Sequence, residues 1–247
     1  MKITVMGAAG LIGAQVAELL RAAGHDVVAA ARSTGADVLT GEGLDNALAG
    51  ADVLIDVTNS PSLEDGPVID FFSRSTANLV AAGRAAGVGH YVVLSIVGTD
   101  RLPDSGYMRA KVLQENAVIE SGLPYTILRA TQFDEFAEMI VGSLVVGDEV
   151  HAPDARIQPI AAAEVAAEVA RVALAAPHGG IVNLGGPEKL SFADLARALL
   201  AASNDARNVV VDSAATYFGT PIDEHSLVTG DDAVIAETTF GQWLAAR

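Results

Sequence analysis

Three glycines that follow the first hydrophobic segment constrain this chain more than any other feature. Residues 2–6 form a short run rich in β-branched side chains, and Gly7, Gly10 and Gly13 come next at three-residue spacing. Apolar residues at helical spacing follow, starting at Val16. This order predicts a strand, a tight turn and the N-terminus of a helix.

A turn of this kind lets backbone N–H groups approach a pyrophosphate, and the dipole of the following helix favours the negative charge. We expect Gly7 to make the turn, Gly10 to leave room for phosphates and Gly13 to let the helix lie close to the strand. The alternative is a loop that only turns the chain. The residues of this loop expected to contact a dinucleotide are Gly7, Ala9, Gly10, Leu11, Ile12 and Gly13.

The end of the second predicted strand, residues 27–31, bears on the choice of dinucleotide. An acidic residue about 20 positions after such glycines would bind the ribose 2′-hydroxyl of NAD. This chain has Arg32 and Ser33 there instead. A guanidinium and a hydroxyl would bind a 2′-phosphate, which favours NADP. The alternative for Arg32 is an ordinary surface arginine.

Polar side chains follow the third long apolar run. Residues 52–57 are continuously apolar apart from their aspartates, as in a buried parallel strand. Thr58, Asn59 and Ser60 come directly after it, at the edge where ligands bind in such sheets. They are candidates for contact with a cofactor ribose, and plain turn residues are the alternative.

The first half of the chain alternates between strand and helix patterns, which predicts parallel βαβ units with helices on both faces. We expect a doubly wound Rossmann-type α/β domain over residues 1–130, including a short strand at 37–39. The alternation stops after Arg129. Residues 131–247 are expected to form a small, mostly helical lobe on the carboxyl edge of the sheet. At its start, Gln132 and Phe133 are candidates for lining a substrate cleft, with core packing as the alternative.

Tyr107 and Lys111 stand four residues apart in a predicted helix, so they share one face. A neighbouring ammonium stabilises a phenolate and would lower the tyrosine pKa. Tyr107 could then protonate a carbonyl oxygen that receives a hydride. Lys111 could also bind a nicotinamide ribose, and Ser95, at the end of a strand, could orient the carbonyl. A surface tyrosine–lysine pair is the alternative.

The three glycines, Ser95 and the Tyr107-to-Lys111 spacing resemble the short-chain dehydrogenase/reductase superfamily. The fuller pattern is similar to its atypical, NmrA-like branch and extends over most of the chain, weakening after about Asp212. The stretches that carry the likeness are residues 94–98, 107–111 with Glu115, 123–133 and 183–187. The resemblance implies an NADP-binding Rossmann domain and a C-terminal lobe that shapes a substrate cleft.

One position departs from that family. Many active members carry an asparagine in the helix before the serine strand, and this chain has Phe72 there. Some members of the branch bind the cofactor and regulate partners without catalysis. We therefore keep two hypotheses: an NADPH-dependent reductase of a small carbonyl or quinone-like substrate, and an NADP(H)-binding redox sensor with a regulatory protein partner. A homodimer is compatible with either.

Charge and composition narrow the remaining classes. A formal net charge of −16 disfavours nucleic-acid binding, because a phosphate backbone would be repelled. The chain has no cysteine, which excludes disulfides and thiolate chemistry. The five histidines show no metal-binding spacing. No uncharged apolar run reaches the length of a membrane span, so we expect a cytoplasmic protein without a membrane anchor.

Overall fold

The computed structural model describes residues 1–247, which divide into two compact units. The first unit comprises residues 1–95, 106–129 and 165–182. The second comprises residues 96–105, 130–164 and 183–247. A single boundary after residue 130 does not describe this division, because the chain returns to the first unit over residues 165–182.

A seven-stranded sheet has the order β12-β9-β5-β4-β3-β1-β2. The pairs β1–β2, β1–β3, β3–β4 and β9–β12 are parallel. The strands are β1 (Lys2–Met6), β2 (Asp26–Ala30), β3 (Val53–Asp56), β4 (His90–Ile96), β5 (Tyr125–Ala130), β9 (Ile181–Gly185) and β12 (Val234–Ile235). Since β1 lies between β2 and β3, the strand order reverses at β1, which makes the carboxyl ends of β1 and β3 a switch point where ligands bind.

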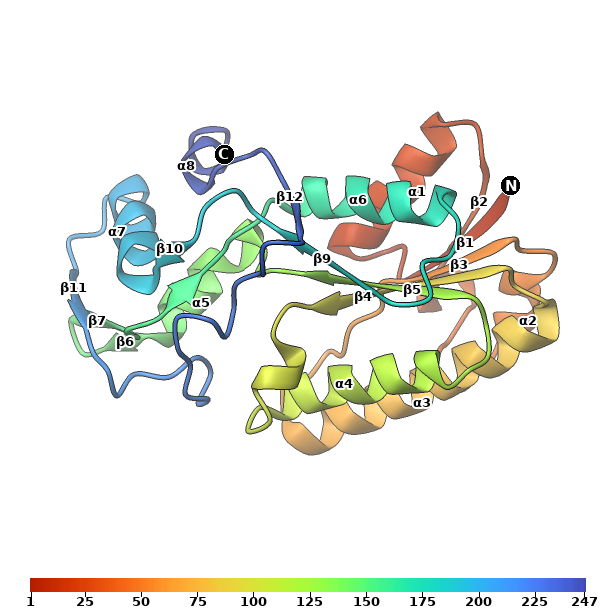
Figure 1. Ribbon diagram of the computed structural model, residues 1–247, viewed down its shortest axis with the longest axis horizontal. Coiled ribbons are helices and arrows are strands. Elements are labelled where there is room, and N and C mark those ends of the chain that lie inside the picture. The colour runs from red at the N-terminus through yellow and green to blue at the C-terminus, as the bar shows by residue number, and fades with distance from the viewer. The chain divides into compact units, whose positions relative to one another are not determined.

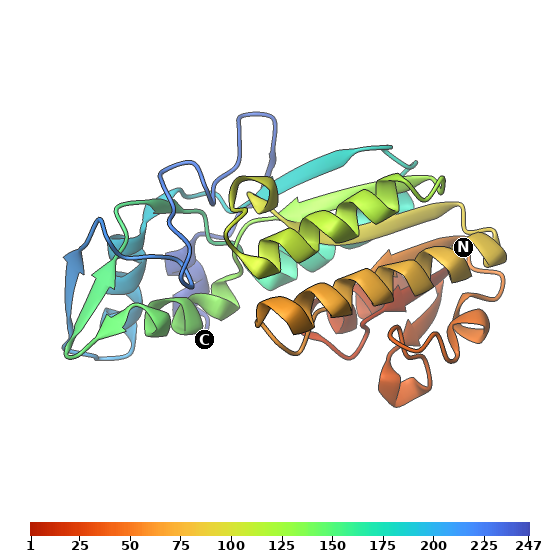
Figure 2. The same ribbon diagram turned by 90° about the horizontal axis from the view of Figure 1, so that it is seen from below.

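Helices cover both faces of this sheet, as predicted. In Figure 1, α1 (Leu11–Ala22) and α6 (Ala162–Leu174) lie on one face, and α3 (Asp65–Ala86) and α4 (Gly106–Ile119) lie on the other. Figure 2 shows α3 and α4 side by side along their length. The short α2 (Leu44–Leu48) precedes β3. The Rossmann-type α/β fold is therefore confirmed.

The core of the first unit forms where apolar strands meet the apolar stripes of these helices. Met6, Leu54 and Tyr91, from three neighbouring strands, pack in one cluster with Leu79 of α3 and Leu44 of α2. All five side chains are buried. This burial fixes the sheet on which the strand ends rest, so the loops at those ends have a rigid base.

The second unit contains both helices and small sheets. A three-stranded sheet has the order β11-β7-β6, and β8 pairs with β10. Its strands are β6 (Val145–Val146), β7 (Glu149–Ala152), β8 (Arg156–Ile157), β10 (Leu190–Ser191) and β11 (Asn208–Val211). Its helices are α5 (Ala137–Ser143), α7 (Phe192–Ala202) and α8 (Phe240–Ala245), with 3₁₀ turns η2 (Thr99–Arg101) and η3 (Asp134–Phe136).

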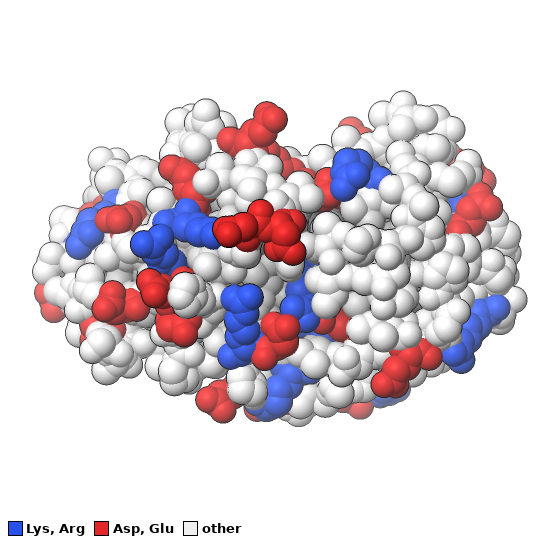
Figure 3. Space-filling model, viewed as in Figure 1, with Lys and Arg blue, Asp and Glu red and all other residues white.

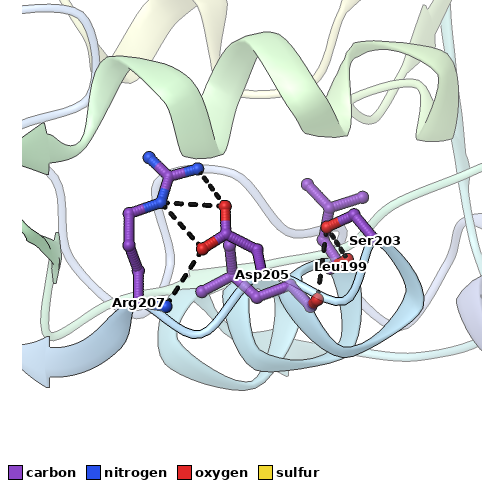
Figure 4. A network of polar contacts seen from close by, with 5 residues as sticks. Leu199, Ser203, Asp205 and Arg207 are labelled. Atoms are coloured by element: carbon purple, nitrogen blue, oxygen red, sulfur yellow. Dashed lines mark hydrogen bonds and ion pairs between the residues drawn. The ribbon is translucent and has the colours of Figure 1, made fainter.

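A local polar network shapes the connection from α7 to β11 (Figure 4). The Ser203 hydroxyl donates to the Leu199 carbonyl at 3.0 Å, which closes the last turn of α7. Arg207 donates to Asp205 from its side chain, at 2.5 Å from Nη2, and from its backbone N–H, at 3.0 Å. These bonds lower the pKa of the Asp205 carboxyl. The network fixes a tight turn at the surface.

The predicted strand at 37–39 is wrong. Asp37 instead begins a turn: its side chain accepts the N–H of Leu39 at 2.7 Å, and its carbonyl accepts the N–H of Gly41 at 2.9 Å. Local side-chain bonds of this kind compete with strand pairing.

Charged groups of both signs lie near one another on one face of the protein. On the face shown in Figure 3, Lys and Arg side chains are interspersed with Asp and Glu. None of the helices is both long and apolar enough to span a bilayer. No cluster of three or more His, Asp or Glu side chains could hold a metal ion.

Candidate functional site

Three strand ends meet at Gly7. Its φ of +88° lies in the left-handed region, which favours glycine. A Cβ on Gly7 would lie 2.9 Å from the carbonyl oxygen of Val57, which comes just after β3. The backbone N–H of Gly7 donates to the Ala30 carbonyl of β2 at 3.0 Å. The predicted turn is confirmed, since only a glycine fits this position.

A side chain would clash with the backbone at Gly13 but would find open space at Gly10. A Cβ on Gly13 would lie 2.3 Å from the Gly7 carbonyl oxygen, so the helix can approach the loop only without a side chain there. A Cβ on Gly10 would meet only that same oxygen, at 3.3 Å, and the exposed loop is otherwise open. Gly10 also begins α1 without a side-chain cap, so the first N–H groups of α1 lack a side-chain acceptor. The loop therefore has the space and donors that a pyrophosphate needs.

Arg32 and Ser33 lie in a short 3₁₀ turn, η1 (Arg32–Thr34), directly after β2. Both side chains are exposed and make no hydrogen bond or ion pair within the chain. Thr34 fixes the turn instead, by donating to the Ala31 carbonyl at 2.9 Å and accepting the Ala31 N–H at 2.9 Å. The guanidinium and the Ser33 hydroxyl are therefore both available to a ligand.

The loop after β3 brings the predicted ribose contacts beside Tyr107. The Thr58 hydroxyl donates to Asp56 at 2.7 Å, and the buried Ser60 hydroxyl accepts the Ser62 N–H at 3.2 Å. Asn59 is exposed, and its Oδ1 accepts the Tyr107 hydroxyl at 2.6 Å. The structure thus places the Tyr107 phenol at the loop after β3, and the first residue of that loop, Val57, lies against Gly7.

Tyr107 is half-buried at the start of α4, with its ring edge-to-face on Phe72 at 5.9 Å between centroids. Burial raises the pKa of the Tyr107 phenol to about 12, and the bond to Asn59 offsets part of this rise. The lowering that we expected from Lys111 is not found. The phenol is protonated at neutral pH, the state that a proton donor needs.

The Lys111 ammonium is hydrogen-bonded to groups other than Tyr107. Its side chain is 3% exposed, and its ammonium donates to the Leu94 carbonyl at 2.8 Å and to Gln114 Oε1. It also lies 4.6 Å from the centroid of Phe72. Burial lowers the pKa of Lys111 to about 8, although Asp56 and Glu115 favour the charged form. Sequence reasoning missed Gln114, whose only signal is its position three residues after Lys111.

Phe72 stands at the position where the family resemblance implies an asparagine, and the structure shows what its ring contacts. The ring is fully buried, against both Tyr107 and Lys111. A phenyl ring can accept a cation on its face but offers no amide for a proton relay. Any relay through α3 at this position is therefore absent.

Ser95 is 2% exposed, at the boundary of the first unit. Its hydroxyl donates to Glu115 Oε1 at 2.5 Å, and Glu115 is also paired with Arg129 at 2.6 Å. The three side chains join β4, α4 and β5. The role of Ser95 in orienting a substrate stays a prediction, because its hydroxyl is bound to Glu115 in this structure.

Gln132 and Phe133 belong to the second unit. Neither polar atom of the Gln132 amide has a hydrogen-bond partner, although the residue is buried. Phe133 stacks on Phe136 at 5.4 Å between centroids. Asp134, which follows Phe133, is 1% exposed, and neither of its carboxyl oxygens has a hydrogen-bond partner. Burial and the nearby carboxylates raise the pKa of Asp134 to about 7. Contact with a substrate stays a prediction for Gln132 and Phe133.

A strand, a glycine turn and an uncapped helix N-terminus at the switch point of a parallel sheet define a dinucleotide-binding protein of the Rossmann type. Residues 7–176 match the NAD(P)H-binding family. The chain belongs to this family, as the resemblance to atypical short-chain dehydrogenases/reductases predicted. Membership of the NmrA-like branch stays a prediction.

Among curated relatives, the chain is 30% identical over 221 residues to an NAD(P)H azoreductase of Xenophilus azovorans, covering 81% of this chain and 73% of that protein. It is 34% identical over 145 residues to a (4-alkanoyl-5-oxo-2,5-dihydrofuran-3-yl)methyl phosphate reductase of Streptomyces griseus, covering 53% of this chain. It is 28% identical over 147 residues to the photosystem II assembly factor Ycf39 of Cyanophora paradoxa, covering 54% of this chain. The matches span about half the length of the last two proteins, 48% and 46%.

Solved structures share the fold at low identity. The Bordetella bronchiseptica enzyme WbmH in complex with NAD⁺ superposes with a TM-score of 0.76 at 16% identity, over 99% of this chain and 96% of that one. A short-chain dehydrogenase/reductase superfamily protein from Agrobacterium tumefaciens with bound NAD gives 0.71 at 20% identity, over 100% and 95%. These likenesses establish the architecture.

Proposed function

We propose that this protein is an NADPH-dependent oxidoreductase that reduces a small carbonyl or quinone-like substrate. The observation that carries the proposal is the position of Tyr107. Its hydroxyl is bound at 2.6 Å to Asn59, on the loop after β3, and that strand end lies against the glycine turn. A proton donor is therefore bound to the loop after β3, and the start of that loop lies against the turn in which a dinucleotide would bind.

The open side of Gly10, the uncapped start of α1 and the free Arg32 side chain all fit a dinucleotide phosphate. We assign NADP rather than NAD because Arg32 and Ser33 have no partner within the chain and no carboxylate stands at residues 31–36, directly after β2. A charge-assisted bond from a guanidinium favours a 2′-phosphate, which NAD lacks. A bound reduced nicotinamide would supply the hydride.

Tyr107 is the proposed general acid. It would donate its proton to the substrate oxygen that gains negative charge, in place of the bond to Asn59. Lys111 would stabilise the resulting phenolate and bind the cofactor ribose, and Ser95 would orient the carbonyl. The substrate itself would contact Gln132 and Phe133. The reductase names of two relatives support small-molecule reduction as the reaction class.

A second function is a redox sensor that binds NADP(H) and regulates a partner protein. Two observations favour it: Phe72 occupies the asparagine position, and the Lys111 ammonium is bound away from Tyr107. The likeness to a photosystem II assembly factor also shows that a relative is named for assembly rather than for catalysis. Such a sensor requires different partner affinities for its oxidised and reduced cofactor states.

The deciding experiment measures NADPH consumption over a panel of aldehydes, ketones and quinones. With any substrate found, Tyr107→Phe should lower kcat by about 10²–10⁴-fold, the usual contribution of general acid–base catalysis. Its NADPH affinity should stay near that of the wild type, since the ring is kept. Tyr125→Phe is the matched control, because Tyr125 is half-buried in β5. Undiminished turnover in Tyr107→Phe would end the catalytic assignment.

A further inference from the structure

The position of the Lys111 ammonium is set by groups other than Tyr107. The ammonium donates to the Leu94 carbonyl at 2.8 Å and to Gln114 Oε1, over the ring of Phe72. The Leu94 carbonyl belongs to β4 and is fixed by the sheet. Gln114 is a side chain, and something must hold it in turn.

Asp56 holds Gln114. The Gln114 side chain is 1% exposed, and its Nε2 donates to Asp56 Oδ2 at 2.9 Å while its Oε1 accepts from Lys111. A carboxylate only accepts hydrogen bonds and an ammonium only donates them. The amide can therefore bridge them in one orientation, with its nitrogen toward Asp56 and its oxygen toward Lys111.

Asp56 is a rigid anchor because the rest of its carboxylate is bonded as well. Its Oδ1 accepts the N–H and the hydroxyl of Thr58, at 3.0 and 2.7 Å, and its Oδ2 also accepts the Tyr91 hydroxyl at 3.2 Å. Asp56 is fully buried as the last residue of β3. Burial of both charges is costly, and the amide between them gives each charge a partner.

We propose that Gln114 is a positioning residue that holds the Lys111 ammonium on the carboxyl side of the sheet, with Asp56 as its anchor, and thereby preorganises the lysine for the dinucleotide. This inference rests on the proposed function only in naming the dinucleotide. A long, flexible lysine that is already fixed loses less conformational entropy when a ligand binds. An apolar residue at position 114 would remove one hydrogen-bond partner from each charge. The Lys111 ammonium, then held only by the Leu94 carbonyl and the Phe72 ring, would be less well ordered before binding.

The first test needs no cofactor. The chain has three lysines, Lys2, Lys111 and Lys189, so ¹⁵Nζ-lysine NMR gives few signals, and a Lys111→Met sample assigns the buried one. The wild-type Lys111 signal should titrate with a pKa of about 8. In Gln114→Met the midpoint should fall, because the charged form loses an acceptor.

Gln158→Met is the matched control. Gln158 is equally buried in the second unit, where it donates to the Gly186 carbonyl at 2.7 Å and accepts the Thr229 N–H at 2.8 Å. Its loss should destabilise the protein in the same way as the loss of Gln114, but it should leave the Lys111 titration unchanged. A general loss of stability is thereby separated from a specific effect on the lysine.

The second test is NADPH affinity, measured by fluorescence titration. Gln114→Met should weaken binding by roughly 3- to 10-fold, the value of one long side chain that must be ordered on binding, whereas Gln158→Met should bind as the wild type does. An unchanged Lys111 midpoint in folded Gln114→Met would overturn the positioning role. If the wild type bound no NADPH, the proposed function would fail, while the lysine titration would still test the contact with Gln114.

Discussion

The glycine loop and the inner face of α4 lie in the same unit but are prepared for a ligand in opposite ways. Around Gly10 the chain leaves open space, and Arg32 and Ser33 are exposed without partners. On α4 the polar side chains of Lys111 and Glu115 are buried and hydrogen-bonded to partners within the fold. One region offers free groups to a ligand, and the other offers fixed ones.

The contrast has a physical reason. Backbone N–H groups and a surface guanidinium stay solvated until a phosphate replaces the water, so their exposure costs nothing. A lysine or glutamate inside the fold must have partners in the free protein, because an unpaired buried charge costs several kcal/mol. The buried groups can therefore be placed accurately, but they are not at once available to a ligand.

The largest expected effect is a loss of cofactor affinity when the glycine loop is filled. Gly10→Val would fill the space left for the pyrophosphate, and both NADPH and NADH should bind about 100-fold more weakly or not at all. The fold should survive, since a Cβ here meets only one backbone oxygen, at 3.3 Å. Isothermal titration measures the loss. Gly142→Val, in open space on α5, is the control. Wild-type affinity in Gly10→Val would show that the pyrophosphate binds elsewhere.

The next effect concerns a single exposed charge. Arg32→Ala should weaken NADPH binding by about 1.5–3 kcal/mol, which is the contribution of a charge-assisted hydrogen bond. NADH binding should not change, because NADH has no 2′-phosphate, and this serves as the internal control. Titration of both cofactors against both proteins gives the answer. Equal NADPH and NADH affinities in the wild type would refute the assignment of NADP.

The sequence predicted the open region, which is the glycine loop with Arg32 and Ser33, better than the closed region, which is the buried polar face of α4. The turn at Gly7 and the close approach at Gly13 followed from spacing, because both are local and depend on the absence of a side chain. The doubly wound sheet followed from the alternation of apolar runs. Arg32 could be predicted as a free ligand-binding group from the sequence, because that prediction depends on no tertiary contact.

The partners of Lys111 could not be predicted in this way. Gln114 is one turn away, but Asp56 is 58 residues before it, and only the folded sheet brings the two together. Helical spacing placed Tyr107 and Lys111 on one face, and it did not show that Asn59 would bind the phenol while Phe72 and Gln114 held the ammonium. Tertiary contacts decided where each polar atom points.

Asp134 extends the comparison to a group that is buried but has no partner. Its neighbours Glu135, Glu164 and Glu188 add to the effect of burial and raise its pKa to about 7 from a usual value of 3.8. The stability associated with the raised pKa is complete below pH 3.8 and is lost as the pH rises through 7. Asp134→Asn removes this dependence.

The expected result for Asp134→Asn is a Tm above that of the wild type by about 5 °C at pH 8, with a much smaller difference at pH 4.5. Thermal denaturation at several pH values measures it. Asp148→Asn replaces an exposed carboxylate in the same unit and should shift Tm equally at both pH values. A pH-independent difference for Asp134→Asn would mean that the carboxyl is ionised in the fold.

Ser95 gives the smallest expected effect and the closest test of the closed region. Its hydroxyl already donates to Glu115, and Arg129 donates to the same carboxylate, so Ser95→Ala removes one of several bonds to that group. The unfolding free energy should fall by about 1 kcal/mol, and denaturant titration measures this loss. If the bond to Glu115 persists when a substrate binds, kcat should fall less than tenfold. A loss of kcat near that of Tyr107→Phe, with normal NADPH affinity, would instead show that the hydroxyl leaves Glu115 to orient the carbonyl, and that the closed region opens during turnover.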